Sequence, residues 1–142
     1  CILLDQFEPG HERGSSHGDG RIYRFAYVED IYVDMMALSI EHWHALQRFA
    51  GEKLLVKTGG VNIADVADSK GKLSHLQALY SRRGFEHQRL GAAALRDRFP
   101  QFVLPDSKEA LFQPDMGVLF ASKCVKATWS FAQSLGVELR PS

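Results

Sequence analysis

The pattern of apolar and polar residues along the 142-residue chain predicts short strands alternating with helices. Residues 1–5 form a continuous apolar run that ends in an acid, which is typical of a buried parallel strand whose neighbours come from elsewhere. Residues 6–20 carry spaced glycines and serines and are expected to form a loop. From Asp30, apolar residues recur every three or four positions as far as Gly51, which predicts a long helix with an N-cap and a terminating glycine.

The rest of the chain shows the same two periodicities. Gly59-Gly60 joins strand-like residues 54–58 and 61–65 and predicts a tight hairpin. Helices are expected over residues 73–80 and 92–98, with a strand at 86–90 between them. Residues 109–114 and 117–121 read as a second hairpin, and a final helix capped by Ser122 leads to a last strand. This order indicates βαβ pieces of a parallel sheet at the two ends and antiparallel α+β structure in the middle.

Composition narrows the class of protein. Hydrophobic residues make up 45% of the chain and charged residues 24%, as in soluble globular domains. Seventeen basic and seventeen acidic residues cancel without clustering, which argues against nucleic acid or anionic lipid as a partner. No apolar run approaches the roughly 20 residues that a membrane helix needs. Cys1 and Cys124 form no disulfide framework, so we expect a reducing compartment, and a start at Cys1 within a strand suggests that the sequence was cut.

The chemistry-bearing residues gather between Asp5 and Arg24. An acid at the end of a strand can accept hydrogen bonds from a ribose, although such an acid is more often an ordinary surface residue. Serine hydroxyls and glycine amides can hold phosphates or a ring edge, and arginine suits a carboxylate. Arg21 and Arg24 are expected on the first turn of a helix, where a spacing of three gives them one face. The alternative is a solvated loop with two surface arginines. We predict no metal site, because His42 and His44 point to different faces of their helix.

The stretch GSSHGDGRIYRFAY, at residues 14–27, resembles the segment after the second strand in monomeric and peroxisomal sarcosine oxidases and pipecolate oxidase, flavoenzymes of the D-amino-acid oxidase-like superfamily. Further matching motifs follow in the same order: YVEDIYVDMM, KTGG, RFP, LP and GVLFASKC. The resemblance implies a partial FAD-binding domain of the Rossmann-like, glutathione-reductase type with an inserted antiparallel α+β segment. Residues 1–56 and 117–142 would belong to the FAD-binding part and residues 57–116 to the substrate domain.

The resemblance also implies a function: an FAD-dependent oxidase of sarcosine or a related secondary or cyclic amino acid, giving an imine and H₂O₂. Glycine, pipecolate or another N-methyl amino acid are alternative substrates, and O₂ would be the electron acceptor. Asp5 would meet the adenosine ribose, and Ser15, Ser16, His17 and Arg21 would line the FAD. His17 and Arg21 would lie close to the reacting ring, and Arg24 would pair with the substrate carboxylate. The complete enzyme would be a peroxisomal or cytoplasmic monomer.

One family feature is missing, because no GxGxxG phosphate-binding motif occurs among the 142 residues. Gly20 also stands where the family usually has a small hydroxyl residue, which removes one cofactor hydrogen bond, worth roughly 0.5–1.5 kcal/mol. We therefore expect the isolated chain to be inactive. A truncated or degenerate flavoprotein fragment without catalysis is the alternative function. Cys124 is expected to be a small core-facing helix residue.

Overall fold

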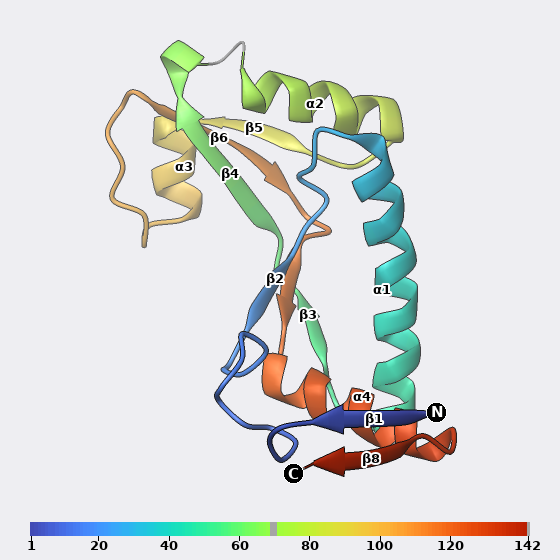
Figure 1. The fold of residues 1–142 in the computed structure, drawn as a ribbon. Helices are drawn as coiled ribbons and strands as arrows, with labels where there is room; N and C mark the ends of the chain where they lie inside the picture. The colour runs from blue at the N-terminus through green and yellow to red at the C-terminus, as the bar shows by residue number, and fades with distance from the viewer. Residues whose placement is uncertain (69–70, 142) are drawn as a thin grey trace. The chain divides into compact units, whose positions relative to one another are not determined.

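The computed structural model describes residues 1–68 and 71–141 (Figure 1). Contacts divide them into two compact units, one made of residues 1–23, 37–56 and 118–142 and the other of residues 24–36 and 57–117. Residues 24–36 thus group with the second unit, whereas the sequence places them in the first FAD-binding segment. The assignment of cofactor and substrate roles to residues 1–56, 57–116 and 117–142 stays a prediction.

The first unit begins with strand β1 (Ile2–Asp5), which pairs in parallel with β8 (Glu138–Pro141). The parallel strand is therefore confirmed, and one of its neighbours, β8, comes from this chain itself. Its burial was predicted wrongly, since the exposed fractions of Ile2, Leu3 and Leu4 are 53%, 39% and 74%. An apolar run is compatible with burial on both faces but does not supply the residues that would cover them.

A second sheet has the strand order β2-β7-β3, from β2 (Arg21–Tyr23), β7 (Gly117–Leu119) and β3 (Leu55–Lys57). The helical turn expected at Arg21 and Arg24 is wrong, because Arg21 opens β2 and Arg24 follows its end. Successive side chains of a strand alternate in direction, so a spacing of three does not give these arginines a common face.

Residues 37–50 of one long helix and the whole of another complete the first unit's core. Helix α1 (Asp30–Ala50) and helix α4 (Ala121–Ser134) match the predicted periodic stretches, and Gly51 and Gly136 follow them with positive φ. Leu54, Cys124 and Ala127 form a buried cluster against which four half-buried side chains pack: Trp43, Leu46, Ala50 and Leu119. Gln47 fixes the segment after α1, because its Oε1 accepts hydrogen bonds from the N–H groups of Leu54 and Leu55 at 2.9 and 3.3 Å.

The second unit contains an antiparallel sheet of order β4-β6-β5, made of β4 (Gly60–Asp65), β6 (Lys108–Gln113) and β5 (Gln88–Gly91). A 3-10 turn (Val66–Asp68) follows β4. Side chains alternate across β6, so Ala110 points toward helix α3 (Ala92–Arg98). There it packs with Leu90 of β5 and with Leu95 of α3 itself. Helix α2 (Lys72–Arg83) contacts β4 and β6 (Figure 1). Gly84 ends this helix in the left-handed conformation.

Both predicted hairpins are wrong. Strand β3 pairs with β7 and β4 with β6, so the strands on either side of Gly59-Gly60 lie in different sheets, as do β6 and β7. The glycines serve close packing, because a β-carbon on Gly60 would lie 2.6 Å from the sulfur of Met116. A tight link between two strands indicates a change of direction but does not identify the partner of either strand.

Candidate functional site

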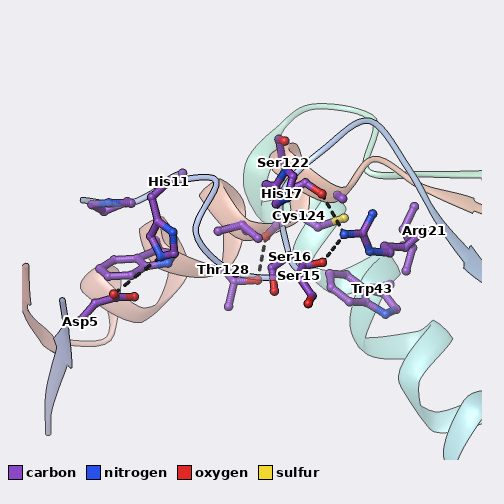
Figure 2. Close-up of a pocket in the computed structure, with 17 residues that line it drawn as sticks. Asp5, His11, Ser15, Ser16, His17, Arg21, Trp43, Ser122, Cys124 and Thr128 are labelled. Carbon is purple, nitrogen blue, oxygen red and sulfur yellow. Dashed lines mark hydrogen bonds and ion pairs between the residues drawn. The ribbon is translucent and has the colours of Figure 1, made fainter. Parts of the chain in front are cut away.

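A pocket of about 430 Å³ lies within the first unit (Figure 2). Its size falls within the range of small-molecule sites. It is lined by the end of β1 and the loop that follows it, by Arg21 of β2, by Trp43 of helix α1, by Leu119 of β7, and by one side of helix α4 as far as Trp129. All five residues predicted to contact a cofactor are among those lining it: Asp5, Ser15, Ser16, His17 and Arg21. In the view of Figure 2, Asp5 and His11 lie at one end and Arg21 and Trp43 at the other, with Ser15, Ser16 and Thr128 between them.

Asp5 is held by the residues that follow it. Its Oδ1 accepts a hydrogen bond from the N–H of Phe7 at 3.0 Å and lies 3.7 Å from Nε2 of His11. Because Nδ1 of His11 accepts from the N–H of Arg13 at 3.0 Å, neutral His11 carries its proton on Nε2, facing Asp5. Both contacts use Oδ1, and within the described chain no hydrogen bond engages Oδ2 of Asp5. That oxygen is therefore available to a hydroxyl donor in the pocket.

Arg21 is fixed by the loop that precedes it. Its Nη1 donates to the carbonyl of Gly20 at 2.7 Å, and its Nη2 donates to the carbonyls of His17, at 2.8 Å, and of Ser15. The guanidinium therefore lies in the pocket wall as a preorganised positive group. The donors of this guanidinium bind backbone carbonyl oxygens of the preceding loop.

Helix α4 holds the same loop from the other side. Ser122 was predicted to cap this helix, but the helix begins at Ala121, after Phe120 as N-cap residue. Ser122 instead donates to the carbonyl of Gly18, from its Oγ at 2.9 Å and its N–H at 3.2 Å. At Gly20, a β-carbon would lie 3.0 Å from Cγ1 of Val118, so the small residue at this position fits tight packing against β7.

One face of helix α4 forms the apolar wall of the pocket. Its residues recur at steps of three and four: Ala121, Cys124, Val125, Thr128 and Trp129. Cys124 is a free, buried thiol, as predicted, and its Sγ lies 3.6 Å from the carbonyl of Leu54. Burial raises the pKa of the Cys124 thiol, and the negative charge of Glu52 acts in the same direction. This cysteine therefore packs as a protonated, unreactive side chain.

Arg24, predicted to bind a substrate carboxylate, is not among the residues that line the pocket. It belongs to the second unit, where its guanidinium carbon lies 5.8 Å from the ring centroid of Tyr27. Its charge also lowers the pKa of Tyr80, although burial is the larger effect and raises that pKa to about 12. Arg24 therefore acts electrostatically on a buried phenol of the same unit.

Among residues 1–68 and 71–141, no three histidine, cysteine or acidic side chains are grouped as metal ligands would be. Over the same residues, no helix combines the length and the apolar character needed to cross a bilayer.

Comparison with known proteins decides the family. The model of the FAD dependent oxidoreductase family, DAO, matches residues 1–142. The chain belongs to this family. It is 38% identical over 135 residues to the peroxisomal sarcosine oxidase of Homo sapiens, covering 95% of this chain and 34% of that protein. It is also 33% identical over 136 residues to a monomeric sarcosine oxidase of Bacillus sp. (strain NS-129), covering 95% of this chain and 35% of that one.

The fold agrees with this membership. The chain superimposes with a TM-score of 0.85 and 24% identity on the open form of NikD, an unusual amino acid oxidase essential for nikkomycin biosynthesis, covering 99% of this chain and 36% of that one. The mixed α/β fold therefore matches part of an oxidase structure. The chain spans about a third of the length of the curated relatives that it matches.

The residues present fit part of a flavin nucleotide. Serine hydroxyls, an acid with an available oxygen and a fixed guanidinium face an apolar wall with two tryptophans, Trp43 and Trp129. This combination suits a ligand with a flat ring and hydroxylated links. The donors expected for its phosphates are absent from this sequence, which has no GxGxxG motif.

The sequence analysis did not predict the helical wall of the pocket, nor the loop residue His11. His11, Trp43, Ser122 and Trp129 were not predicted to line a site. The three-and-four spacing along α4 was the available signal, but such spacing predicts a covered face without saying whether protein or ligand covers it. His11 carried no signal, because its contact with Asp5 depends on the turn of the intervening loop.

Proposed function

We propose that this chain is part of an FAD-dependent oxidase that acts on sarcosine or a related secondary or cyclic amino acid and yields an imine and H₂O₂. The observation that carries the proposal is the meeting of Asp5, Ser15, Ser16, His17 and Arg21 in one pocket of a chain from this family. The fold of the first unit would then be the Rossmann-like, glutathione-reductase type of FAD-binding domain. Its parallel β1–β8 pair is consistent with that assignment.

The first unit's residues have complementary roles in this proposal. Oδ2 of Asp5 accepts a hydrogen bond from a ribose hydroxyl, and the hydroxyls of Ser15 and Ser16 bond to the polar parts of the cofactor. His17 and Arg21 lie near the ring, where a fixed positive group favours the negative charge that reduction creates. Bound FAD would supply the redox chemistry, namely acceptance of a hydride equivalent from the substrate C–H bond and transfer of the electrons to O₂.

Arg24 is the proposed partner of the substrate carboxylate. It is exposed, and its planar donors suit a carboxylate in a bidentate arrangement. The sarcosine oxidases among the relatives support sarcosine as substrate, with glycine, pipecolate or another N-methyl amino acid as alternatives. We further propose that the complete protein acts as a monomer in peroxisomes or cytoplasm, as one relative is named peroxisomal.

The alternative function is a truncated or degenerate flavoprotein fragment without catalysis. One experiment separates the two. The complete gene product is purified, its visible flavin bands are followed as sarcosine or pipecolate is added without O₂, and H₂O₂ is measured when O₂ is admitted. The oxidase loses its flavin bands and then releases H₂O₂. Retained flavin that no amino acid bleaches would identify the non-catalytic alternative.

The role of Arg24 is tested separately. Arg24→Lys keeps the charge but loses the bidentate fork, so KM for the amino acid should rise by about tenfold or more. Arg48→Lys, an exposed arginine in the last turn of α1, is the matched control and should leave KM unchanged. An unchanged KM in the Arg24→Lys variant would contradict the carboxylate assignment.

A further inference from the structure

Four carbonyl groups of the loop at residues 14–20 accept hydrogen bonds from two residues outside it. The Arg21 guanidinium donates to the carbonyls of Ser15, His17 and Gly20. Ser122 donates to the carbonyl of Gly18 from both its Oγ and its N–H. The loop itself contains no helix or strand. These contacts from β2 and α4 therefore determine the path of its backbone.

We propose that Arg21 is a positioning residue which, together with Ser122, clamps this loop so that Ser15, Ser16 and His17 line the pocket. The clamp works through the geometry of the guanidinium rather than through its charge. The inference rests on the proposed function only for the identity of the ligand, since the clamp belongs to the protein without a ligand.

The loop needs such a clamp because its own packing is slight. The residues from Glu12 to Asp19 are exposed, and Gly18 has a positive φ of 97°. Fixing an exposed segment costs conformational entropy at every residue, which bonds from rigid elements must offset. Hydrogen bonds from a charged donor are stronger than neutral ones, so one arginine on β2 can hold several carbonyls.

The same contacts weaken a purely electrostatic role for Arg21. The negative ends of three carbonyl dipoles surround the guanidinium and offset part of its field in the pocket. Two of these bonds come from Nη2 and one from Nη1, a spread of donors that requires the planar fork. A lysine ammonium concentrates its donors at one atom and cannot span the same carbonyls.

The Ser122 amide offers a direct reporter. Its N–H donates to the carbonyl of Gly18, so its hydrogen exchange follows the loop although Ser122 itself lies in helix α4. Subtilisin, which has broad specificity, reports separately on opening of residues 12–20 through its rate of cleavage there. Neither readout requires flavin or activity.

The experiment compares Arg21→Lys and Arg21→Gln in the complete gene product. Both variants should raise Ser122 amide exchange and cleavage within residues 12–20 by about tenfold or more, the effect of losing charge-assisted hydrogen bonds. Ser122→Ala removes only the Oγ bond and should raise cleavage by less. The control Arg13→Lys, on the same loop with its guanidinium over the Phe7 ring, should change neither readout.

Three results would overturn the clamp. If Arg21→Lys behaves as wild type while Arg21→Gln does not, charge alone suffices. If both Arg21 variants unfold throughout, or if neither changes the loop, Arg21 does not act locally on it. Failure of the protein to bind FAD would count against the proposed function and leave these measurements intact.

Discussion

The ring of Phe112 lies so close to Gly59 that a β-carbon on Gly59 would be 2.6 Å from Cε2 of Phe112. Gly59 also has a φ of +71°, and its N–H donates to the carbonyl of Met116 at 2.9 Å. The glycine thus lets the link between β3 and β4 pass against the end of β6. Both its conformation and its missing side chain are required.

Gly59→Ala should lower the free energy of unfolding by about 2–5 kcal/mol. Two effects add: alanine is strained in the left-handed conformation, and its β-carbon overpacks against Phe112. Urea denaturation followed by circular dichroism measures the loss.

Gly84→Ala is the matched control, because Gly84 has the same φ of +71° and nothing within 4 Å of its β-carbon position. Its loss should be only the conformational cost, about 1–2 kcal/mol. Equal losses in the two variants would show that Phe112 moves aside freely.

Tyr80 should make stability sensitive to alkaline pH. Burial raises its pKa to about 12, against smaller opposing effects of Arg24 and Asn62. The unfolded chain releases the proton near the ordinary value of 10, so the stabilisation is complete below pH 10 and is lost as pH rises toward 12. The full difference corresponds to ~3 kcal/mol, measurable by urea titrations across this range.

Tyr80→Phe should remove that part of the alkaline loss and leave stability at neutral pH unchanged or slightly higher. The Tyr80 hydroxyl is buried near the Asn62 side chain, which lowers its pKa slightly, but among the described residues neither this hydroxyl nor Nδ2 of Asn62 makes a hydrogen bond of normal geometry. Little is therefore lost with the hydroxyl. A clear loss of stability at neutral pH would mean that the hydroxyl is bonded in solution.

The ion pair between Arg89 and Glu109 predicts sensitivity to acid. Nε and Nη2 of Arg89 donate to the two oxygens of Glu109 at 2.9 and 2.5 Å, which lowers the pKa of Glu109. The stabilisation is present above pH 4.5 and is lost as pH falls through the lower pKa of the folded state. Glu109→Gln should flatten this dependence in acid titrations, whereas Glu86→Gln, an exposed residue, should preserve it.

The two cysteines should react at very different rates. Cys1 is exposed, while burial raises the pKa of Cys124. Because the thiolate is the reacting form, iodoacetamide at pH 8 should label Cys1 first and Cys124 only slowly, as peptide mass spectrometry can follow. Both should react quickly in urea. Equal rates in the folded protein would contradict the packing of Cys124 against Leu54.

Local patterns predicted the helices well because each depends on its own residues. Helix α3 covers the predicted residues, and α1 begins at Asp30 and ends just before Gly51. Strand pairing was not predicted, since the partner of β4 lies some fifty residues away in β6. Strand β2 was misread because three residues are too few to show an alternation.

The candidate site divides in the same way. The loop residues Asp5, Ser15, Ser16 and His17 stand close together in the sequence and could be predicted from their chemistry and from family resemblance. The wall from α4 lies more than one hundred residues further on, and only folding brings Ser122 to Gly18. The sequence therefore predicted the loop residues that line the pocket but not the helices that enclose it.

The central claim is that this chain contributes to a flavin site. The most direct measurement is the visible absorption spectrum of the complete gene product purified under native conditions. The predicted result is flavin bands that correspond to one FAD per protein chain, and a lower FAD content in the Asp5→Ala variant. A protein that contains no flavin, and takes none up when FAD is added, would contradict the account.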